Sequence, residues 1–173
     1  MPTYIALLRG INVGGHNKVS MTSLRALHES LGHADVTTYI QSGNVVFNST
    51  KPVTSASLER AIENELGMDI TVVLRTRAEM ARVVRANPFS DADLKTLHVG
   101  FMASKPAAAA VRDLDPDQFA PEEFAIKGAQ LYLHLPNGIG RAKLPTHLDR
   151  KLKVPTTVRN WKTVEKLLEL AGG

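Results

Sequence analysis

The chain has 173 residues, no cysteine, 43% apolar residues and a formal net charge of +4 at neutral pH. Lack of cysteine excludes a disulfide framework, a cysteine nucleophile and a zinc site built on thiolates. No apolar run approaches the roughly 20 residues of a membrane-spanning helix, and the first residues do not resemble a signal sequence, so we expect a cytoplasmic protein that does not enter a membrane. The slight excess of positive charge favours phosphate-bearing partners.

The first 76 residues predict four strands and two helices from hydrophobic periodicity and from the residues that begin and end each element. In chain order they are a strand at 4–9, a helix at 21–31, strands at 36–41 and 44–47, a helix at 55–66 and a strand at 70–75. This β-α-β-β-α-β order is that of the ferredoxin-like fold, in which both helices cover one face of an antiparallel sheet.

The second half begins with a helix at 78–86, which ends before Pro88. A strand at 97–102, a helix at 107–112, strands at 123–126 and 130–135, and helices at 147–151 and 161–170 follow. This β-α-β-β-α order echoes the first half and suggests a structural pseudo-repeat. We therefore predict an α+β protein with a ferredoxin-like lobe at 1–76 and a second small α+β lobe at 77–173.

The predicted hairpin places two sets of side chains on opposite faces of the first sheet. A two-residue turn at Ser42-Gly43 pairs Ile40 with Val45 and Tyr39 with Val46. Alternation then directs Ile40, Val45 and Phe47 toward the helices, and it leaves Tyr39, Gln41, Asn44 and Asn48 on the other face, within reach of Arg75. That polar face either binds a ligand or packs against the second lobe.

A glycine-rich stretch at 9–18 connects the first predicted strand to the first helix. Loop amides and the positive end of a helix dipole suit an anion, and Arg9, His16 and Lys18 add cationic or donor side chains. The stretch fails the phosphate-loop pattern of nucleotide hydrolases, because His16 and Asn17 stand where lysine and a hydroxyl residue are required. Alternatively, the glycines only allow a tight connection with positive φ angles.

A second glycine-rich basic stretch lies at 137–143, and a third polar cluster precedes the only tryptophan, Trp161. We expect the three stretches to form a pocket between the lobes for a phosphorylated or otherwise anionic small molecule. The expected binding residues are Arg9, Asn12, Gly14, Lys18, Tyr39, Gln41, Asn44, Arg141, Lys143 and Arg159. Solvated surface charges are the alternative interpretation of the basic residues.

No reaction follows from the sequence. The six histidines lack paired metal-ligand spacing, and no nucleophile elbow is present, so we assign no catalytic residue, cofactor or metal. Two other functions stay open: a nucleic-acid-binding module that uses the same cations, which is not favoured because aromatic residues are few, and a phosphate-ester hydrolase or transferase without an identifiable nucleophile.

Four blocks of sequence together resemble a bacterial family that is catalogued as domain of unknown function 1697. The blocks are residues 4–15, 38–47, 140–144 and 159–164, which contain the loops and the hairpin discussed above. The resemblance spans nearly the whole chain. It implies a small cytoplasmic α+β protein of two lobes, the first of them ferredoxin-like, and it implies no activity, cofactor or catalytic residue.

Overall fold

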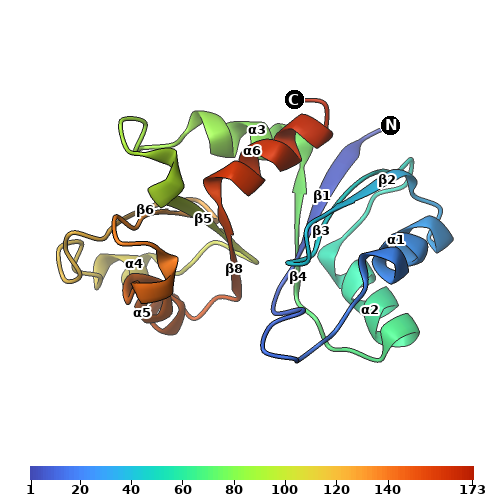
Figure 1. The fold of residues 1–173 in the computed structure, drawn as a ribbon, viewed down its shortest axis with the longest axis horizontal. Coiled ribbons are helices and arrows are strands. Elements are labelled where there is room, and N and C mark those ends of the chain that lie inside the picture. Colours follow the sequence, from blue (N-terminus) through green and yellow to red (C-terminus); the bar gives the residue numbers. More distant parts are fainter. The chain divides into compact units, whose positions relative to one another are not determined.

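Two four-stranded antiparallel sheets organise the chain, which the computed structural model describes from residue 1 to residue 173 (Figure 1). The chain divides into two units. The first unit contains Met1–Arg82 together with Lys166–Gly173, and the second contains Val83–Glu165. None of the helices is both long enough and apolar enough to cross a membrane.

The first unit has the predicted ferredoxin-like order of elements. Its elements are β1 (Thr3–Leu8), α1 (Met21–Ser30), β2 (Ala34–Tyr39), β3 (Asn44–Asn48), α2 (Ser55–Leu66) and β4 (Val72–Thr76). The strands lie in the order β2-β3-β1-β4, and all neighbours are antiparallel. Helix α3 (Arg77–Arg85) begins at the residue after β4.

The second unit repeats this arrangement. Its elements are β5 (Leu97–Met102), α4 (Ala108–Arg112), β6 (Glu123–Lys127), β7 (Gln130–His134), α5 (Leu144–Leu152) and β8 (Thr156–Asn160), followed directly by α6 (Trp161–Leu170). Short 3-10 turns lie at Leu94–Thr96 and Ile139–Arg141. The strand order β6-β7-β5-β8 matches that of the first sheet position by position. Compared with the predicted order β-α-β-β-α, the second unit thus has one more strand, β8, and one more helix, α6.

Strand β8 is the element that the sequence prediction missed. Its residues, Thr156 to Asn160, include only one apolar side chain, so the alternation that marks a half-buried strand is weak. Its pairing with β5 identifies it: Thr156 lies opposite Met102, and Asn160 lies opposite His98.

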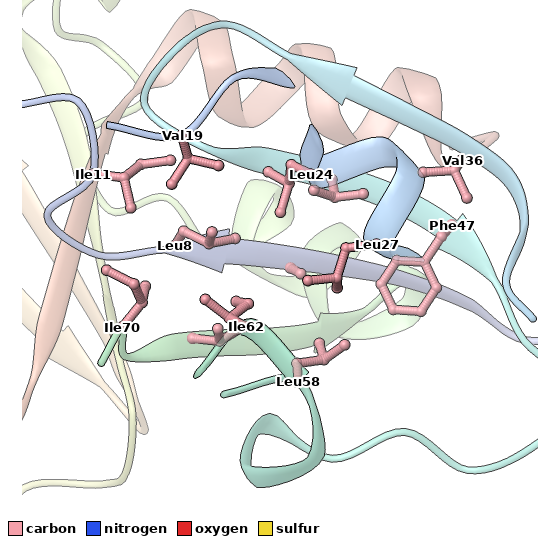
Figure 2. Packing of buried hydrophobic residues seen from close by; sticks show 13 residues of the cluster. Leu8, Ile11, Val19, Leu24, Leu27, Val36, Phe47, Leu58, Ile62 and Ile70 are labelled. Carbon is pink, nitrogen blue, oxygen red and sulfur yellow. The ribbon is translucent and has the colours of Figure 1, made fainter. Parts of the chain in front are cut away.

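One hydrophobic cluster joins α1 and α2 to one face of the first sheet. Leu24 and Leu27 of α1 and Leu58 and Ile62 of α2 pack with Phe47 and other apolar residues of the strands. Figure 2 shows Ile11 and Val19, from the connection between β1 and α1, at the same end of this cluster as Leu8. Burial of these side chains is the main stabilising contribution to the unit. It also anchors both ends of the connection described below.

The connection between the first strand and the first helix differs between the units. In the first unit it runs from Arg9 to Ser20, between Leu8 and Met21. In the second unit it runs only from Ala103 to Ala107. The long connection of the first unit contains the glycine-rich stretch.

The division into units differs from the expected 1–76 and 77–173. It falls within α3, between Arg82 and Val83, and within α6, between Glu165 and Lys166. Buried residues continue through both helices, with Met80 and Val83 in α3 and Val164 and Leu167 in α6. A helix that remains apolar along one side gives no compositional break, so the sequence alone does not mark this division.

The predicted register of the β2–β3 hairpin is wrong. Tyr39 lies opposite Asn44, and residues 40–43 form a four-residue loop, so Ile40 pairs with no residue of β3 and is 47% exposed. Val45 and Phe47 do face the helices, as predicted. The turn is set by contacts with β1 and with the connection that follows it, which the local dipeptide Ser42-Gly43 does not reveal.

The second face of the first sheet carries Tyr39, Asn44 and Asn48, as predicted, but its centre is not polar. Alternation places Ile5, Leu7, Val46 and Val73 opposite the helix-covered face, and each is at most 3% exposed. This second face is therefore apolar and buried along its centre. Asn44 lies on it but is fully buried as well.

Candidate functional site

The connection between β1 and α1 folds back on itself as a small hairpin. The backbone N–H of Asn12 donates to the carbonyl of Asn17 at 3.1 Å, and that of His16 donates to Val13 at 3.0 Å. Asn12 and Asn17 have φ angles of 54° and 47°, a region that asparagine tolerates better than most residues. Positive φ angles also occur at three glycines of this connection: Gly10, Gly14 and Gly15.

The side chain of Asn12 joins this connection to two other segments. Its Nδ2 donates to the carbonyls of Val19 at 3.0 Å and Gln41 at 2.8 Å, and its Oδ1 accepts from the N–H of Val19 at 2.9 Å. These bonds use both amide hydrogens and the oxygen. Asn12, predicted as a binding residue, therefore holds the connection against the β2–β3 loop.

The β2–β3 loop, residues 40–43, is fixed by close contacts with β1 and Ile11. The N–H of Leu8 donates to the carbonyl of Gly43 at 2.9 Å. A Cβ atom at Gly43 would lie 2.5 Å from Cδ1 of Ile11, and the φ of Gly43 is +89°, so only glycine suits this position. Ile40 has a φ of 49°, which is a genuine outlier for a β-branched residue. Strained backbone of this kind is concentrated at functional sites.

These two loops border a cavity of about 470 Å³ at the N-terminus of α1, which we call the α1 cavity. Side chains and backbone from both loops line it: Asn12, Gly15, Lys18, Val19, Ser20 and Gln41. Three of the ten predicted binding residues, Asn12, Lys18 and Gln41, thus lie around one cavity although Gln41 is distant from the others in sequence.

The polar side chains of the α1 cavity differ in whether they already form hydrogen bonds within the protein. Ser20 caps α1, because its Oγ accepts from the N–H of Ser23 at 3.0 Å and donates to the Ser23 hydroxyl at 2.8 Å. Lys18 is exposed, and its ammonium group forms no ion pair or hydrogen bond. The side-chain nitrogen of Gln41 also donates to no protein group, while Oε1 lies 3.4 Å from Asn12 Nδ2. Together with the positive end of the α1 dipole, Lys18 makes this cavity favourable for an anion.

The other predicted residues of the first unit do not line the α1 cavity. Arg9 is exposed, and its backbone N–H donates to Thr71 at 3.0 Å. Tyr39 is half-buried, opposite Asn44. Asn44 is fully buried and donates from Nδ2 to the Tyr39 carbonyl at 2.8 Å, so it stabilises the hairpin. Gly14 lies at the tip of the small hairpin, between Val13 and His16.

In the second unit, the backbone amides of the second glycine-rich stretch already bind an anionic group of the protein. The carboxylate of Glu122 accepts from the N–H groups of Lys143 at 3.2 Å and Leu144 at 3.0 Å, where α5 begins. The side chains of Arg141 and Lys143 are exposed. Their role in a ligand site stays a prediction, but the helix N-terminus beside them is occupied by Glu122.

Arg159 is buried within β8, with 6% exposure. Its Nη1 donates to Oγ1 of Thr157 at 2.6 Å and to the carbonyl of Val158 at 3.1 Å. Burial lowers the pKa of Arg159 to about 10, so the guanidinium group stays charged at neutral pH. Arg75 has the corresponding place in the first unit. It is the fourth residue of β4, and its Nη1 likewise donates to the preceding carbonyl, that of Leu74, at 2.9 Å.

A separate cavity of about 380 Å³ lies in the first unit beside a pair of histidines. His33 lines it, and its Nδ1 lies 3.0 Å from Nδ1 of His28. Both rings pack on Phe47, with ring centroids 4.6 Å away for His28 and 4.3 Å for His33. Burial, and secondarily the nearby His33, lowers the pKa of His28 to about 3. No group of three or more histidine or carboxylate side chains is placed to hold a metal ion.

Several residues of these sites were not predicted from the sequence. Gly15, Val19 and Ser20 line the α1 cavity, and their position in or directly after the glycine-rich stretch was the available signal. Glu122 and the contact between His28 and His33 gave no comparable signal. Glu122 is 21 residues from Lys143, and the two histidines are five residues apart, which is not a helical contact spacing.

Comparison with known proteins places the chain in a family. The model of a protein family of unknown function, DUF1697, matches residues 1–132, which is more than half of the chain. The chain belongs to the DUF1697 family. A conserved bacterial protein, SP0830 from Streptococcus pneumoniae, has a solved structure with a TM-score of 0.72 and 24% identity, and the match covers 98% of each chain. No curated protein matches the chain.

The predicted resemblance to DUF1697 is thus confirmed. The family match includes the glycine-rich connection and the β2–β3 hairpin, and it ends before residues 140–144 and 159–164. At 24% identity, the likeness to the Streptococcus pneumoniae protein shows the fold alone. Because the DUF1697 description names no activity, any function must be argued from the geometry of this chain.

Proposed function

We propose that this DUF1697 protein binds an anionic small molecule in the α1 cavity. The observation that carries the proposal is the combination of a cavity of about 470 Å³ with an ammonium group, that of Lys18, which no protein group neutralises. Cavities of several hundred cubic ångströms that contain a few polar groups are typical of small-molecule sites. The proposal is for binding, since the one hydroxyl of the lining, that of Ser20, caps α1, and no metal-ligand cluster lines this cavity.

The backbone around the cavity supports the proposal. Asn12 and Asn17 in the connection and Ile40 in the β2–β3 loop all have positive φ angles. Each such residue costs about 1 kcal/mol or more, and tertiary contacts must hold it in place. Here Asn12 supplies those contacts through three hydrogen bonds. A pre-organised loop of this kind reduces the entropy that a ligand would otherwise lose on binding.

The electrostatic balance at the cavity also favours an anion. Lys18 and the N-terminus of α1 both contribute positive potential, and no acidic residue lines the cavity. Helix α1 has no acidic residue in its first turn, where an internal carboxylate would otherwise offset the dipole. The N-terminus of α5 differs in this respect, because Glu122 occupies it.

Isothermal titration calorimetry with phosphate, ribose 5-phosphate and glucose 6-phosphate tests the proposal. We expect one ligand per chain and an affinity that falls as salt is added. Lys18→Met should weaken binding about tenfold, the loss of one exposed charge-assisted contact. Lys105→Met, which removes an exposed charge in the second unit, is the matched control and should bind like the wild type. Absence of binding, or equal binding by both variants, contradicts the proposal.

A further inference from the structure

The α1 cavity is larger than a bare anion requires. Its volume of about 470 Å³ lies within the range of roughly 300–1,000 Å³ that is typical of sites for drug-sized molecules. A single phosphate group beside Lys18 would leave most of this space to water. The ligand therefore has a body in addition to its anionic group.

The remaining free polar group of the cavity is the carboxamide of Gln41. Asn12 and Ser20 use their side chains within the protein, as described above. Gln41 retains both hydrogens of its side-chain nitrogen, and its Oε1 receives only one long contact of 3.4 Å. A carboxamide presents a donor and an acceptor side by side, so it suits a ligand edge that presents the complementary pair.

In the sequence, an exposed apolar residue lies next to each of the two residues whose hydrogen bond joins the loops, although neither apolar residue lines the cavity. Val13 follows Asn12 and is 64% exposed, and Ile40 precedes Gln41 and is 47% exposed. Val19, a buried apolar residue, contributes to the lining itself. The apolar part of the lining, together with exposed apolar residues nearby in the sequence, favours a ligand with an apolar surface. Ile40 has an unfavourable φ, and this backbone conformation costs free energy although the side chain gains no burial from it. Such a cost favours a functional reason for the loop conformation.

We infer that the anionic ligand of the α1 cavity is a nucleoside phosphate, with its phosphate beside Lys18 and the polar edge of its base paired with Gln41. This inference rests on the proposed function, because it assigns the ligand class of the same site. A base combines an apolar face with an edge of neighbouring donors and acceptors. Glutamine pairs with adenine in this bidentate way, through the ring nitrogen and the exocyclic amine. Adenosine 5′-monophosphate is therefore the probe.

Calorimetric titration of the full chain with adenosine 5′-monophosphate, adenosine and ribose 5-phosphate separates the two contacts. We expect the nucleotide to bind about tenfold more tightly than ribose 5-phosphate, because it adds the base contact. Gln41→Ala should reduce nucleotide affinity about tenfold and leave ribose 5-phosphate binding unchanged. Gln118→Ala, at an exposed position of the second unit, is the matched control and should have no effect. Lys18→Met should weaken the binding of both phosphates and spare adenosine.

The outcomes distinguish this inference from the proposed function. If ribose 5-phosphate and the nucleotide bind equally, and Lys18→Met weakens both, the anion site stands and the nucleotide assignment is overturned. If Gln41→Ala leaves nucleotide affinity unchanged, the base contact is likewise overturned. If no phosphate binds in a Lys18-dependent manner, both proposals fail. The Gln41 side chain is exposed, and its backbone carbonyl still accepts from Asn12 in the variant, so the fold is not at risk.

Discussion

The buried histidine His28 makes the stability of the first unit depend on pH. Its side chain is 1% exposed, packs on Phe47 and contacts His33. Because its pKa is lowered from 6.5 to about 3 in the folded protein, the folded state excludes a proton that the unfolded chain binds below pH 6.5. The contribution of neutral His28 is therefore fully present above pH 6.5, and it is lost progressively as the pH falls toward 3.

The size of the effect follows from the shift. Well below pH 6.5 each pH unit costs about 1.4 kcal/mol for a group that is protonated only when unfolded, and near 6.5 it costs less, so His28 removes about 2 kcal/mol between pH 6.5 and 4.5. His28→Leu removes this titration. We expect the loss of unfolding free energy over that interval, measured by urea denaturation at a series of pH values, to be smaller by about 2 kcal/mol in the variant.

Two measurements decide whether the reasoning holds. In NMR titration of the folded protein, the His28 imidazole should remain neutral down to at least pH 4.5. The control His16→Leu removes an exposed imidazole and should keep the pH dependence of the wild type. A His28 ring that protonates near pH 6.5 in the folded state, or parallel stability curves for wild type and His28→Leu, would refute the argument.

Three further substitutions have expected outcomes. Gly43→Ala should lower the free energy of unfolding by about 2–4 kcal/mol, because its Cβ would meet Ile11 at an unfavourable φ, whereas Gly128→Ala, at a φ of +61° with open space, should cost only about 1 kcal/mol in the same urea titration. Asn12→Ala should cost about 2 kcal/mol and increase amide exchange in residues 10–19, and unchanged exchange would contradict its positioning role. Glu122→Ala should destabilise the start of α5 by about 1–2 kcal/mol, an effect that added salt reduces if the carboxylate acts through its charge.

The order of elements was predictable because local signals agree with the tertiary structure. Ser20 caps α1 and Gly67 ends α2 in a left-handed conformation, as their residue types indicate. The apolar alternation of Val45 and Phe47 identified the helix-covered face. The register of the same hairpin was not predictable, since the carbonyl of Gly43 is bound by Leu8 and that of Gln41 by Asn12, both remote in sequence.

The lining of the α1 cavity was predictable in part, from residues that lie beside the glycine-rich stretch or the hairpin turn. Lys18 was identified from its place between a glycine-rich stretch and a helix, and Gln41 from its place beside the hairpin turn. The sequence does not show which polar side chains form hydrogen bonds within the folded protein. Asn12 and Asn44 carry a carboxamide like that of Gln41, but in both residues its nitrogen donates to a backbone carbonyl. Only the folded contacts distinguish them from Gln41.

The unequal connections of the two units limit where a loop of this kind can form. The two units share one strand order, but the twelve residues from Arg9 to Ser20 correspond to only the five from Ala103 to Ala107. Five residues are too few to fold back as a hairpin and to include a residue that is held as Asn12 is. The binding loop proposed above can therefore form in the first unit alone, which is why we expect one ligand per chain.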